Sequence, residues 1–319
     1  MGNECGNADA LILDNYIPAD GDYIVVKKDG SVVRCSIKMD KKAGRPVKDL
    51  SDGDSQYEDI VFYDYHSRLV SMDKPQDPKK VIHSNNYLSF WIKKESLTNG
   101  KLNMEGIDRY FDILSNPRVK YKNAKDSKMY DYIFPVVGEV NQEKLEQCRN
   151  WIKQHIFNMQ DFGIDISGKN YLKVFFEDDR DLYINEEKRY LMTKIYNKND
   201  YNIDIDEQIY GLPNDNLALN SKKPYMEHKT RKNVVPYLIT PEEAATQRKF
   251  FDYLMNEANR GYTNIFFDSD EDEIIPKKPG EFITDDFSGF FIQIQKGKEL
   301  SIQHQDAIVD YKYNLYKHF

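Results

Sequence analysis

The spacing of apolar residues changes twice along this chain of 319 residues, and this change constrains the fold more than any other feature. Apolar and polar residues alternate in residues 1–100, apolar residues recur every three or four positions in residues 101–260, and alternation returns in residues 261–319. Alternation is typical of half-buried strands, and the longer spacing is typical of amphipathic helices. We therefore expect an irregular α+β fold: a β-rich N-terminal region, a mainly helical centre and a β-rich C-terminal region, within one continuous domain or several.

Two antiparallel hairpins are predicted, one in each β-rich region. Asp29-Gly30 separates the apolar runs 23–26 and 31–37, and an Asp-Gly pair in this position is a strong hairpin signal. The second hairpin covers residues 287–309 and is expected to keep one face in water. The apolar residues expected opposite that wet face are Phe290, Ile292 and Ile294.

Three helices are predicted from apolar spacing and capping residues. The first follows Asn103 as N-cap and ends at Asn116-Pro117, and the second covers residues 141–159. The third begins at Thr240-Pro241-Glu242-Glu243, a capping box with proline at the first helical position, and ends near Gly261.

Four further segments have weaker signals. Residues 171–176 are expected to form a buried strand, because they are almost continuously apolar. Residues 187–196 form a short helix or a second strand, and periodicity does not separate the two. Residues 43–55 and 72–80 place glycine or proline among charged residues and are expected to be exposed loops.

Composition and motifs exclude several classes of protein. The net charge of −8 counts against a protein that coats nucleic acid with its whole surface. No apolar run approaches the ~20 residues that span a bilayer, and the first nine residues are polar and acidic, so we expect a cytoplasmic protein without membrane contact. The three cysteines form no CxxC pair and are expected as free thiols. The six histidines form no metal-binding pattern, and no P-loop, GxSxG or GxGxxG occurs, so we expect no catalytic residues, metal or cofactor.

A basic, asparagine-rich segment at residues 210–232 stands apart from this acidic chain. From residue 220 to residue 232 it has five basic residues and one acidic residue, a net charge of +4. Such a cluster repels itself unless a polyanion binds it. Amides bind base edges, a tyrosine ring stacks on a base, and lysines hold phosphates. A solvated lysine-rich turn between two elements accounts for the same residues about equally well.

The predicted nucleic-acid contacts of this segment are Asn214, Asn216, Asn220, Ser221, Lys222, Lys223, Tyr225, Lys229, Arg231 and Lys232. A secondary site is predicted at Asn85 and Asn86, which precede an apolar strand and two lysines. Here the simpler alternative is a turn before a core strand.

Two acidic runs could bind divalent metal. Residues 268–273 hold five carboxylates but lack the glycine and glutamate of an EF-hand loop, and residues 177–181 lack a diagnostic spacing. Solvated surface charge explains both runs better. A metal-dependent nuclease therefore stays an alternative function, beside a protein-binding scaffold that does not touch nucleic acid.

Seven blocks of sequence follow one another over most of the chain. They are residues 11–17 (LILDNYI), 20–26 (DGDYIVV), 86–95 (NYLSFWIKKE), 195–201 (IYNKNDY), 210–232, 236–243 (PYLITPEE) and 250–255 (FFDYLM). In this order they resemble the large subunit of the type I-B CRISPR surveillance complex (Cascade). None of the blocks is a catalytic signature, so the resemblance lies in the overall pattern.

The resemblance implies a non-catalytic subunit that binds nucleic acid in antiviral defence. Such subunits lie near the 5′ handle of the guide RNA, recognise the short duplex motif beside the target (the PAM), help to open the duplex into an R-loop and recruit the helicase-nuclease. The implied partners are the guide RNA, target double-stranded DNA, other Cascade subunits and the helicase-nuclease. Since guide pairing reads the long sequence, the protein needs only a small basic and amide-rich site.

The chain departs from the family pattern at one point. Family members usually continue into a helical C-terminal part that supplies the small subunit, whereas this sequence ends at Phe319 after a β-rich stretch. An N-terminal portion or a compact variant is therefore expected. The basic segment could also hold the guide RNA or a neighbouring subunit instead of the PAM.

Overall fold

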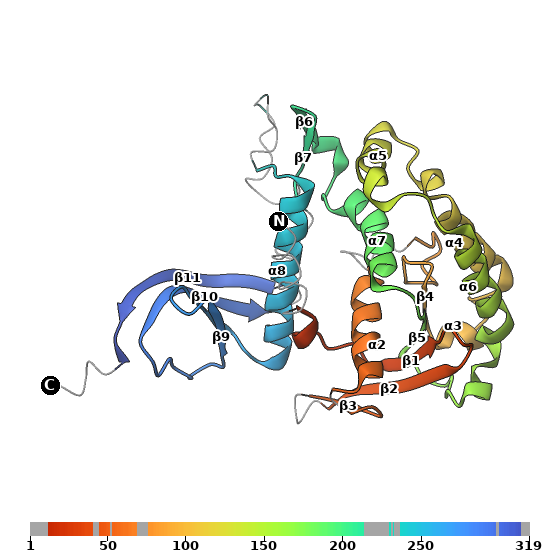
Figure 1. Ribbon diagram of the computed structural model, residues 1–319, viewed down its shortest axis with the longest axis horizontal. Coiled ribbons are helices and arrows are strands. Elements are labelled where there is room, and N and C mark those ends of the chain that lie inside the picture. Colours follow the sequence, from red (N-terminus) through yellow and green to blue (C-terminus); the bar gives the residue numbers. More distant parts are fainter. Residues whose placement is uncertain are drawn as a thin grey trace. The chain divides into compact units, whose positions relative to one another are not determined.

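The computed structural model describes residues 12–40, 45–51, 53–68, 76–213, 230, 232, 237–297 and 300–313. Among these residues, a larger unit runs from Ile17 to residue 213 and again from residue 230 to Ala245. A smaller unit contains residues 12–16 and the residues from Thr246 onward. Helices and mixed sheets occur together, which confirms the predicted α+β fold (Figure 1).

The larger unit is built on a sheet with the strand order β3-β2-β1-β5-β4. These strands are β1 (Gly21–Val26), β2 (Val32–Asp40), β3 (Arg45–Lys48), β4 (Ser89–Lys93) and β5 (Tyr171–Phe176). The predicted hairpin is present as antiparallel β1 and β2, and Gly30 has the positive φ of 85° that its turn requires. Strands β1 and β5 are parallel although about 150 residues separate them along the chain, a spacing that leaves room for crossover helices.

The helices of the larger unit cover both faces of this sheet (Figure 1). They are α2 (Ser55–His66), α3 (Glu95–Thr98), α4 (Met104–Ser115), α5 (Ala124–Val137), α6 (Gln142–His155) and α7 (Arg180–Leu191). Short 3₁₀ turns are η1 (Pro117–Lys120), η2 (Ile156–Phe162), η3 (Met192–Lys194) and η4 (Asn199–Tyr201). A two-stranded ribbon, β6 (Ile203–Ile205) and β7 (Gln208–Tyr210), completes the unit.

Alternation along β5 decides which helix packs on which face. On one face, the Phe175 ring lies 5.9 Å from that of Tyr63 in α2, and the Tyr63 ring stacks on Tyr183 of α7 at 4.4 Å. On the other face, Phe176 meets Trp151 of α6 at 5.6 Å. The sheet is therefore a buried central layer, which explains why β1 and β5 are mostly apolar, with Asp22 and Lys173 as their charged residues.

Side-chain caps set the helix starts that the sequence predicts. The Asn103 side chain accepts from Gly106 N at 2.8 Å, and Asn141 accepts from Lys144 N at 3.0 Å. In α8 (Pro241–Arg260), Thr240 N donates to the Glu243 carboxylate at 2.9 Å, and Glu243 N donates to the Thr240 hydroxyl at 3.2 Å. This reciprocal pair confirms the predicted capping box.

The smaller unit holds an antiparallel sheet with the strand order β11-β10-β8-β9. Its strands are β8 (Asn264–Asp268), β9 (Glu273–Lys277), β10 (Phe287–Lys296) and β11 (Leu300–Tyr311). The predicted C-terminal hairpin is confirmed as β10 and β11. Ile292 and Ile294 are buried as expected, but Phe290 is 61% exposed. The prediction fails at Phe290 because other residues do not cover this part of strand β10.

Several elements differ from the sequence prediction; helix α5, for example, has no predicted counterpart. Strand β3 lies within the predicted loop 43–55. It forms through backbone hydrogen bonds to β2, and such bonds leave no apolar pattern in the sequence. Helix α2 has no counterpart in the prediction, because apolar and polar residues alternate too irregularly along it. Residues 171–176 are the predicted buried strand. Of residues 187–196, those up to Lys194 are helical in α7 and η3, and Tyr196 forms a single β-bridge with Pro213. No described helix has the length and apolar character needed to cross a membrane.

Candidate nucleic-acid interface

The residues that precede and follow most of the predicted basic segment are held at the same place on the larger unit. After β7, Gly211 N donates to Ile239 O at 2.9 Å, and Ile239 N donates to Gly211 O at 3.0 Å. This reciprocal pair joins the start of the segment to Ile239, which follows the segment's last residue, Lys232. We call Gly211, Leu212, Pro213 and Ile239 the stem.

Tyr196 and Asn197 anchor the stem on the larger unit. The Tyr196 hydroxyl donates to Ile239 O at 2.7 Å, and Asn197 N donates to Leu212 O at 2.8 Å. Leu212 is fully buried, and Tyr196 is buried in a cluster with Met129 of α5. Burial raises the pKa of the Tyr196 phenol well above its usual range, so the hydroxyl remains a donor at neutral pH. The stem is therefore a fixed base on the hydrophobic core.

Most of the predicted contacts lie outside the described residues. They are Asn214, Asn216, Asn220, Ser221, Lys222, Lys223, Tyr225, Lys229 and Arg231. Lys232 is described and exposed, as is Thr230. The stem thus fixes where the segment is attached, and its contacts with nucleic acid stay predictions.

Asn85 and Asn86 are fully buried, so neither side chain is available to a nucleic acid on the surface. The Asn86 side chain accepts from Leu88 N at 3.0 Å and donates to Tyr183 O at 3.3 Å. These bonds build the turn before β4, which is the alternative given above for this site. Sequence could not separate the two because an asparagine amide suits a core turn and a base edge equally.

Lysines neutralise the acidic run at residues 177–181. Glu177 accepts from Lys27 Nζ at 3.0 Å and from Lys28 N at 2.9 Å, and the backbone bond is the main cause that lowers its pKa. Asp178 pairs with Lys144 at 2.7 Å, and Asp179 pairs with Lys28 at 3.0 Å. These carboxylates therefore hold the β1–β2 turn and α6 against the start of α7, as solvated structural charge.

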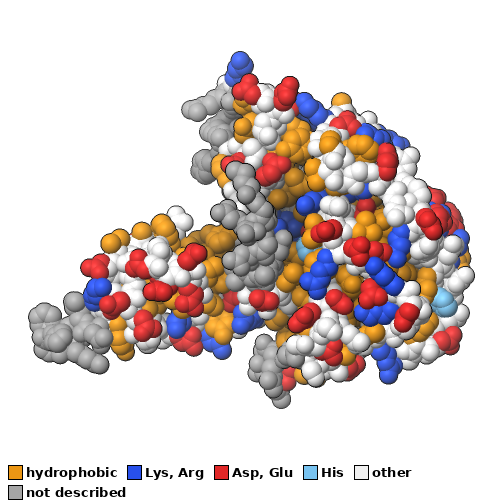
Figure 2. All heavy atoms as spheres, in the orientation of Figure 1, with side chains coloured by type: hydrophobic (Ala, Val, Ile, Leu, Met, Phe, Trp, Pro, Cys, Tyr) orange, Lys and Arg blue, Asp and Glu red, His pale blue; other side chains and the backbone are white. Residues whose placement is uncertain are grey.

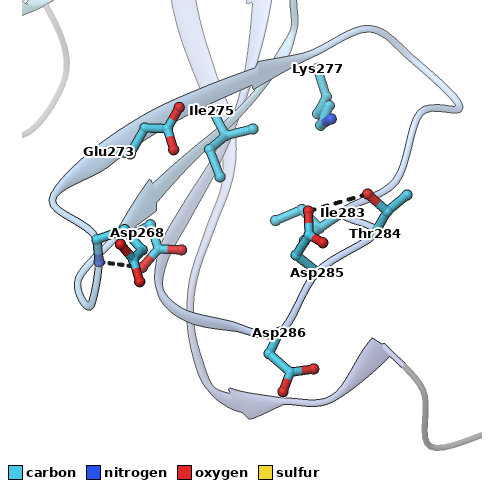
Figure 3. Close-up of a pocket in the computed structure, with 9 residues that line it drawn as sticks. Asp268, Glu273, Ile275, Lys277, Ile283, Thr284, Asp285 and Asp286 are labelled. Atoms are coloured by element: carbon cyan, nitrogen blue, oxygen red, sulfur yellow. Dashed lines mark hydrogen bonds between the residues drawn. The ribbon is translucent and has the colours of Figure 1, made fainter.

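The other acidic run borders a pocket of about 380 Å³ in the smaller unit. Figure 3 shows the carboxylates of Asp268, Glu273, Asp285 and Asp286 around this pocket, with Lys277 at its rim. The Asp268 carboxylate is occupied by its own turn, since it accepts from the backbone N–H groups of Asp270 at 2.9 Å and Glu271 at 3.1 Å. The pocket is negative and does not suit a polyanion.

Charges of both signs are mixed on the described surface in Figure 2, where Lys and Arg side chains alternate with Asp and Glu. The ion pairs of the larger unit explain this mixture. Within the described ranges, no three His, Cys, Asp or Glu side chains gather as a group that could hold a metal ion. Cys35 and Cys148 are buried free thiols, as predicted for these two.

The sequence did not predict that Gly211 pairs with Ile239 in the stem or that Tyr196 anchors this pair. Tyr196, Gly211 and Ile239 lie in three separate blocks of the sequence, at residues 195–201, 210–232 and 236–243. Nothing in the spacing of these three residues along the chain indicates that they contact one another.

No protein-family model matches the chain, and comparison with curated proteins and with solved structures finds no match either.

Replacing Gly211 by alanine is expected to displace the stem. A Cβ at this position would lie 2.5 Å from the Tyr196 ring, closer than two carbons approach. Overpacking of this kind costs about 1–3 kcal/mol of unfolding free energy, to be measured by urea denaturation. Adding Tyr196→Ala should make the two changes less than additive, since the ring that clashes is then absent. Full additivity would show that the Tyr196 ring does not limit this position.

Proposed function

We propose that this chain is a non-catalytic nucleic-acid-binding protein that contacts its ligand through the basic segment 210–232. The observation that supports the proposal is the stem. It pairs Gly211 with Ile239 at one buried point of the larger unit, and the residues between them include the stretch 220–232 with its net charge of +4. A loop with joined ends loses less entropy when it binds than a free tail does.

The charge of the whole chain fits a local contact. The chain carries a net charge of −8, and the face drawn in Figure 2 has charges of both signs, so we expect a polyanion to bind only where basic residues cluster. Binding is then limited to a few phosphates, with asparagine amides available to base edges. A few phosphate contacts combined with amide contacts to base edges suit a protein that reads a short motif.

We propose further, from the resemblance of sequence blocks, that the protein acts as the large subunit of a type I-B Cascade. In that role the segment recognises the PAM on duplex DNA and aids its opening, while the guide RNA reads the remaining sequence. Its partners are then the guide RNA with its 5′ handle, target DNA, other Cascade subunits and the helicase-nuclease. The Asn214, Asn216 and Asn220 amides read bases, and the lysines hold phosphates.

The test is binding of duplex DNA and of guide-handle RNA across a salt series. Removing four charges with Lys222→Ala, Lys223→Ala, Lys229→Ala and Arg231→Ala is expected to flatten the slope of log K against log salt by about three to four units. The affinity of this variant at low salt is also expected to fall, because each lost contact no longer releases a counterion.

A matched control removes four charges elsewhere. Lys79, Lys101, Lys122 and Lys169 are exposed, and their replacement by alanine should leave the slope within about one unit of the wild type. Equal binding by the segment variant and the wild type would contradict the proposal and favour the scaffold. Cleavage of DNA with magnesium or manganese that is lost on changing Asp268, Asp270 and Asp272 would favour the nuclease.

A further inference from the structure

A second pocket lies at the edge of the central sheet where the two parallel strands end. Val26 and Phe176 are register partners and the last residues of β1 and β5. A pocket of about 170 Å³ opens there. Ligands of open α/β sheets bind outside the carboxyl ends of parallel strands, because the diverging connections leave a crevice at that edge.

The floor of this pocket is apolar and aromatic. Val26, Phe176 and Cys148 are buried, with exposures of 7%, 6% and 1%. The Trp151 ring stands edge-on to Phe176, with centroids 5.6 Å apart and planes at 85°, and it lines the pocket half-buried. A half-buried indole that is braced by a buried ring offers a rigid surface for a planar ligand.

Three ammonium groups border the same pocket, from Lys27, Lys28 and Lys144. Among the acidic residues only Glu177 lines it with them. The other carboxylates that pair with these lysines hold them from outside the lining: Asp178 lies 2.7 Å from Lys144 Nζ, and Asp179 lies 3.0 Å from Lys28 Nζ. Asp59 likewise lies 3.6 Å from Lys27 Nζ. Within the lining itself the three lysines outnumber the one carboxylate, and the carboxylates outside the lining hold the ammonium groups in place.

The size of the pocket restricts the ligand. Sites that enclose drug-sized ligands measure roughly 300–1,000 Å³, so about 170 Å³ accommodates one planar ring and a small anionic group beside it. An aromatic floor with lysines at the rim recognises a base by stacking and a phosphate by charge. Gln147, also in the lining, supplies an amide for the edge of a base.

We propose that this pocket binds a single unstacked nucleotide, with its base on Trp151 and its phosphate at Lys27, Lys28 and Lys144. The nucleotide is either free or part of a single strand. The site is separate from the basic segment, and the proposal does not rest on the function proposed above.

The experiment titrates the full chain with AMP, CMP, GMP and UMP, and with single-stranded tetranucleotides of each base. Binding is followed by the intrinsic fluorescence of the two tryptophans, of which Trp91 is buried, and by calorimetry. A stacked base is expected to quench Trp151 in a saturable manner. Saturation by mononucleotides assigns a free nucleotide as ligand, whereas saturation by tetranucleotides alone assigns a single strand. Saturation by neither overturns the proposal.

Variants separate the proposed contacts from general effects. Trp151→Leu should weaken binding by about tenfold or more, while Trp151→Phe keeps a ring and should retain most of the calorimetric affinity. Lys144→Gln should weaken mononucleotide binding about tenfold, and Lys144→Arg should restore it.

Lys153→Gln is the matched control, since Lys153 lies on the same helix, pairs with Asp108 at 2.8 Å and does not line the pocket. An equal loss in Lys153→Gln and Lys144→Gln would overturn the proposed phosphate contact. Circular dichroism confirms folding of each variant. The variant without four basic residues of segment 210–232 should bind mononucleotides as the wild type does, so the two proposals can fail independently.

Discussion

Replacing Asp64 by alanine is expected to lower the free energy of unfolding by about 3–5 kcal/mol. Asp64 is fully buried in α2 and accepts a hydrogen bond from Lys173 Nζ of β5, which is 4% exposed. The ammonium also lies 4.0 Å from the centre of the Trp91 ring and 5.1 Å from that of Tyr23, and the nearby charge of Arg68 acts on it as well. Without Asp64 the folded chain buries a cation that has lost its carboxylate.

The loss of unfolding free energy in Asp64→Ala is expected to depend on pH. Burial lowers the pKa of Lys173 from its ordinary 10.5, so at neutral to alkaline pH the unfolded chain binds this proton more tightly than the folded chain. Unfolding free energy then rises with pH up to about 10.5, and more steeply in Asp64→Ala, where the attraction of the carboxylate is gone. The difference between Asp64→Ala and the wild type should therefore narrow from pH 7 to pH 10, as measured by urea denaturation.

The double variant Asp64→Ala with Lys173→Met provides the control. Replacing a buried ion pair by apolar side chains is often neutral, so this variant should unfold much closer to the wild type than Asp64→Ala alone. If the double variant is less stable than Asp64→Ala alone, then Lys173 stabilises the fold through contacts other than its ion pair with Asp64.

Replacing Arg189 by methionine is expected to cost a similar 3–5 kcal/mol for a different reason. Arg189 is fully buried in α7 and binds the Glu186 carboxylate through Nε at 3.0 Å and Nη2 at 2.8 Å. It also donates to the carbonyls of Val137 at 3.0 Å and Gly138 at 2.7 Å, which satisfies the C-terminal end of α5. Methionine fills the volume and leaves all of these acceptors without a donor.

The pH signature of Arg189→Met is opposite to that of Asp64→Ala. Burial raises the pKa of Glu186 even beside Arg189, and loss of the arginine raises it further. The folded chain then binds this proton more tightly than the unfolded chain, so unfolding free energy rises as the pH falls from 7 towards 4.5. Adding Glu186→Gln should restore part of the stability at pH 7 and remove this dependence. A variant whose deficit is independent of pH would show that the helix-end carbonyls, not Glu186, dominate the loss.

Local rules of the sequence predicted the elements whose signals lie within a few residues. Asn103 and Thr240 cap helices as predicted, because a cap needs only its own side chain and the next three N–H groups. The β1–β2 hairpin follows from Asp29-Gly30 for the same reason. Strand β3 was missed because its pairing with β2 depends on a partner strand and not on its own pattern.

The candidate sites depended more on tertiary structure. The basic segment is visible in the sequence as a charge cluster, but the pairing of Gly211 with Ile239 is not. Asn85 and Asn86 have the residue types of a base contact and are buried in a core turn. The pocket beside Trp151 unites residues from β1, α6 and β5, which no spacing along the chain connects.

By itself, the sequence determined the α+β class, the starts of α4, α6 and α8, the two hairpins and the position of the basic segment, because each depends on bonds between near neighbours or on local charge. Only the tertiary structure decided which distant charges meet, such as Asp64 with Lys173, and which edge of the sheet forms a pocket. Partners of that kind are chosen by burial and loop closure over more than 100 residues, and many pairings satisfy the same local pattern.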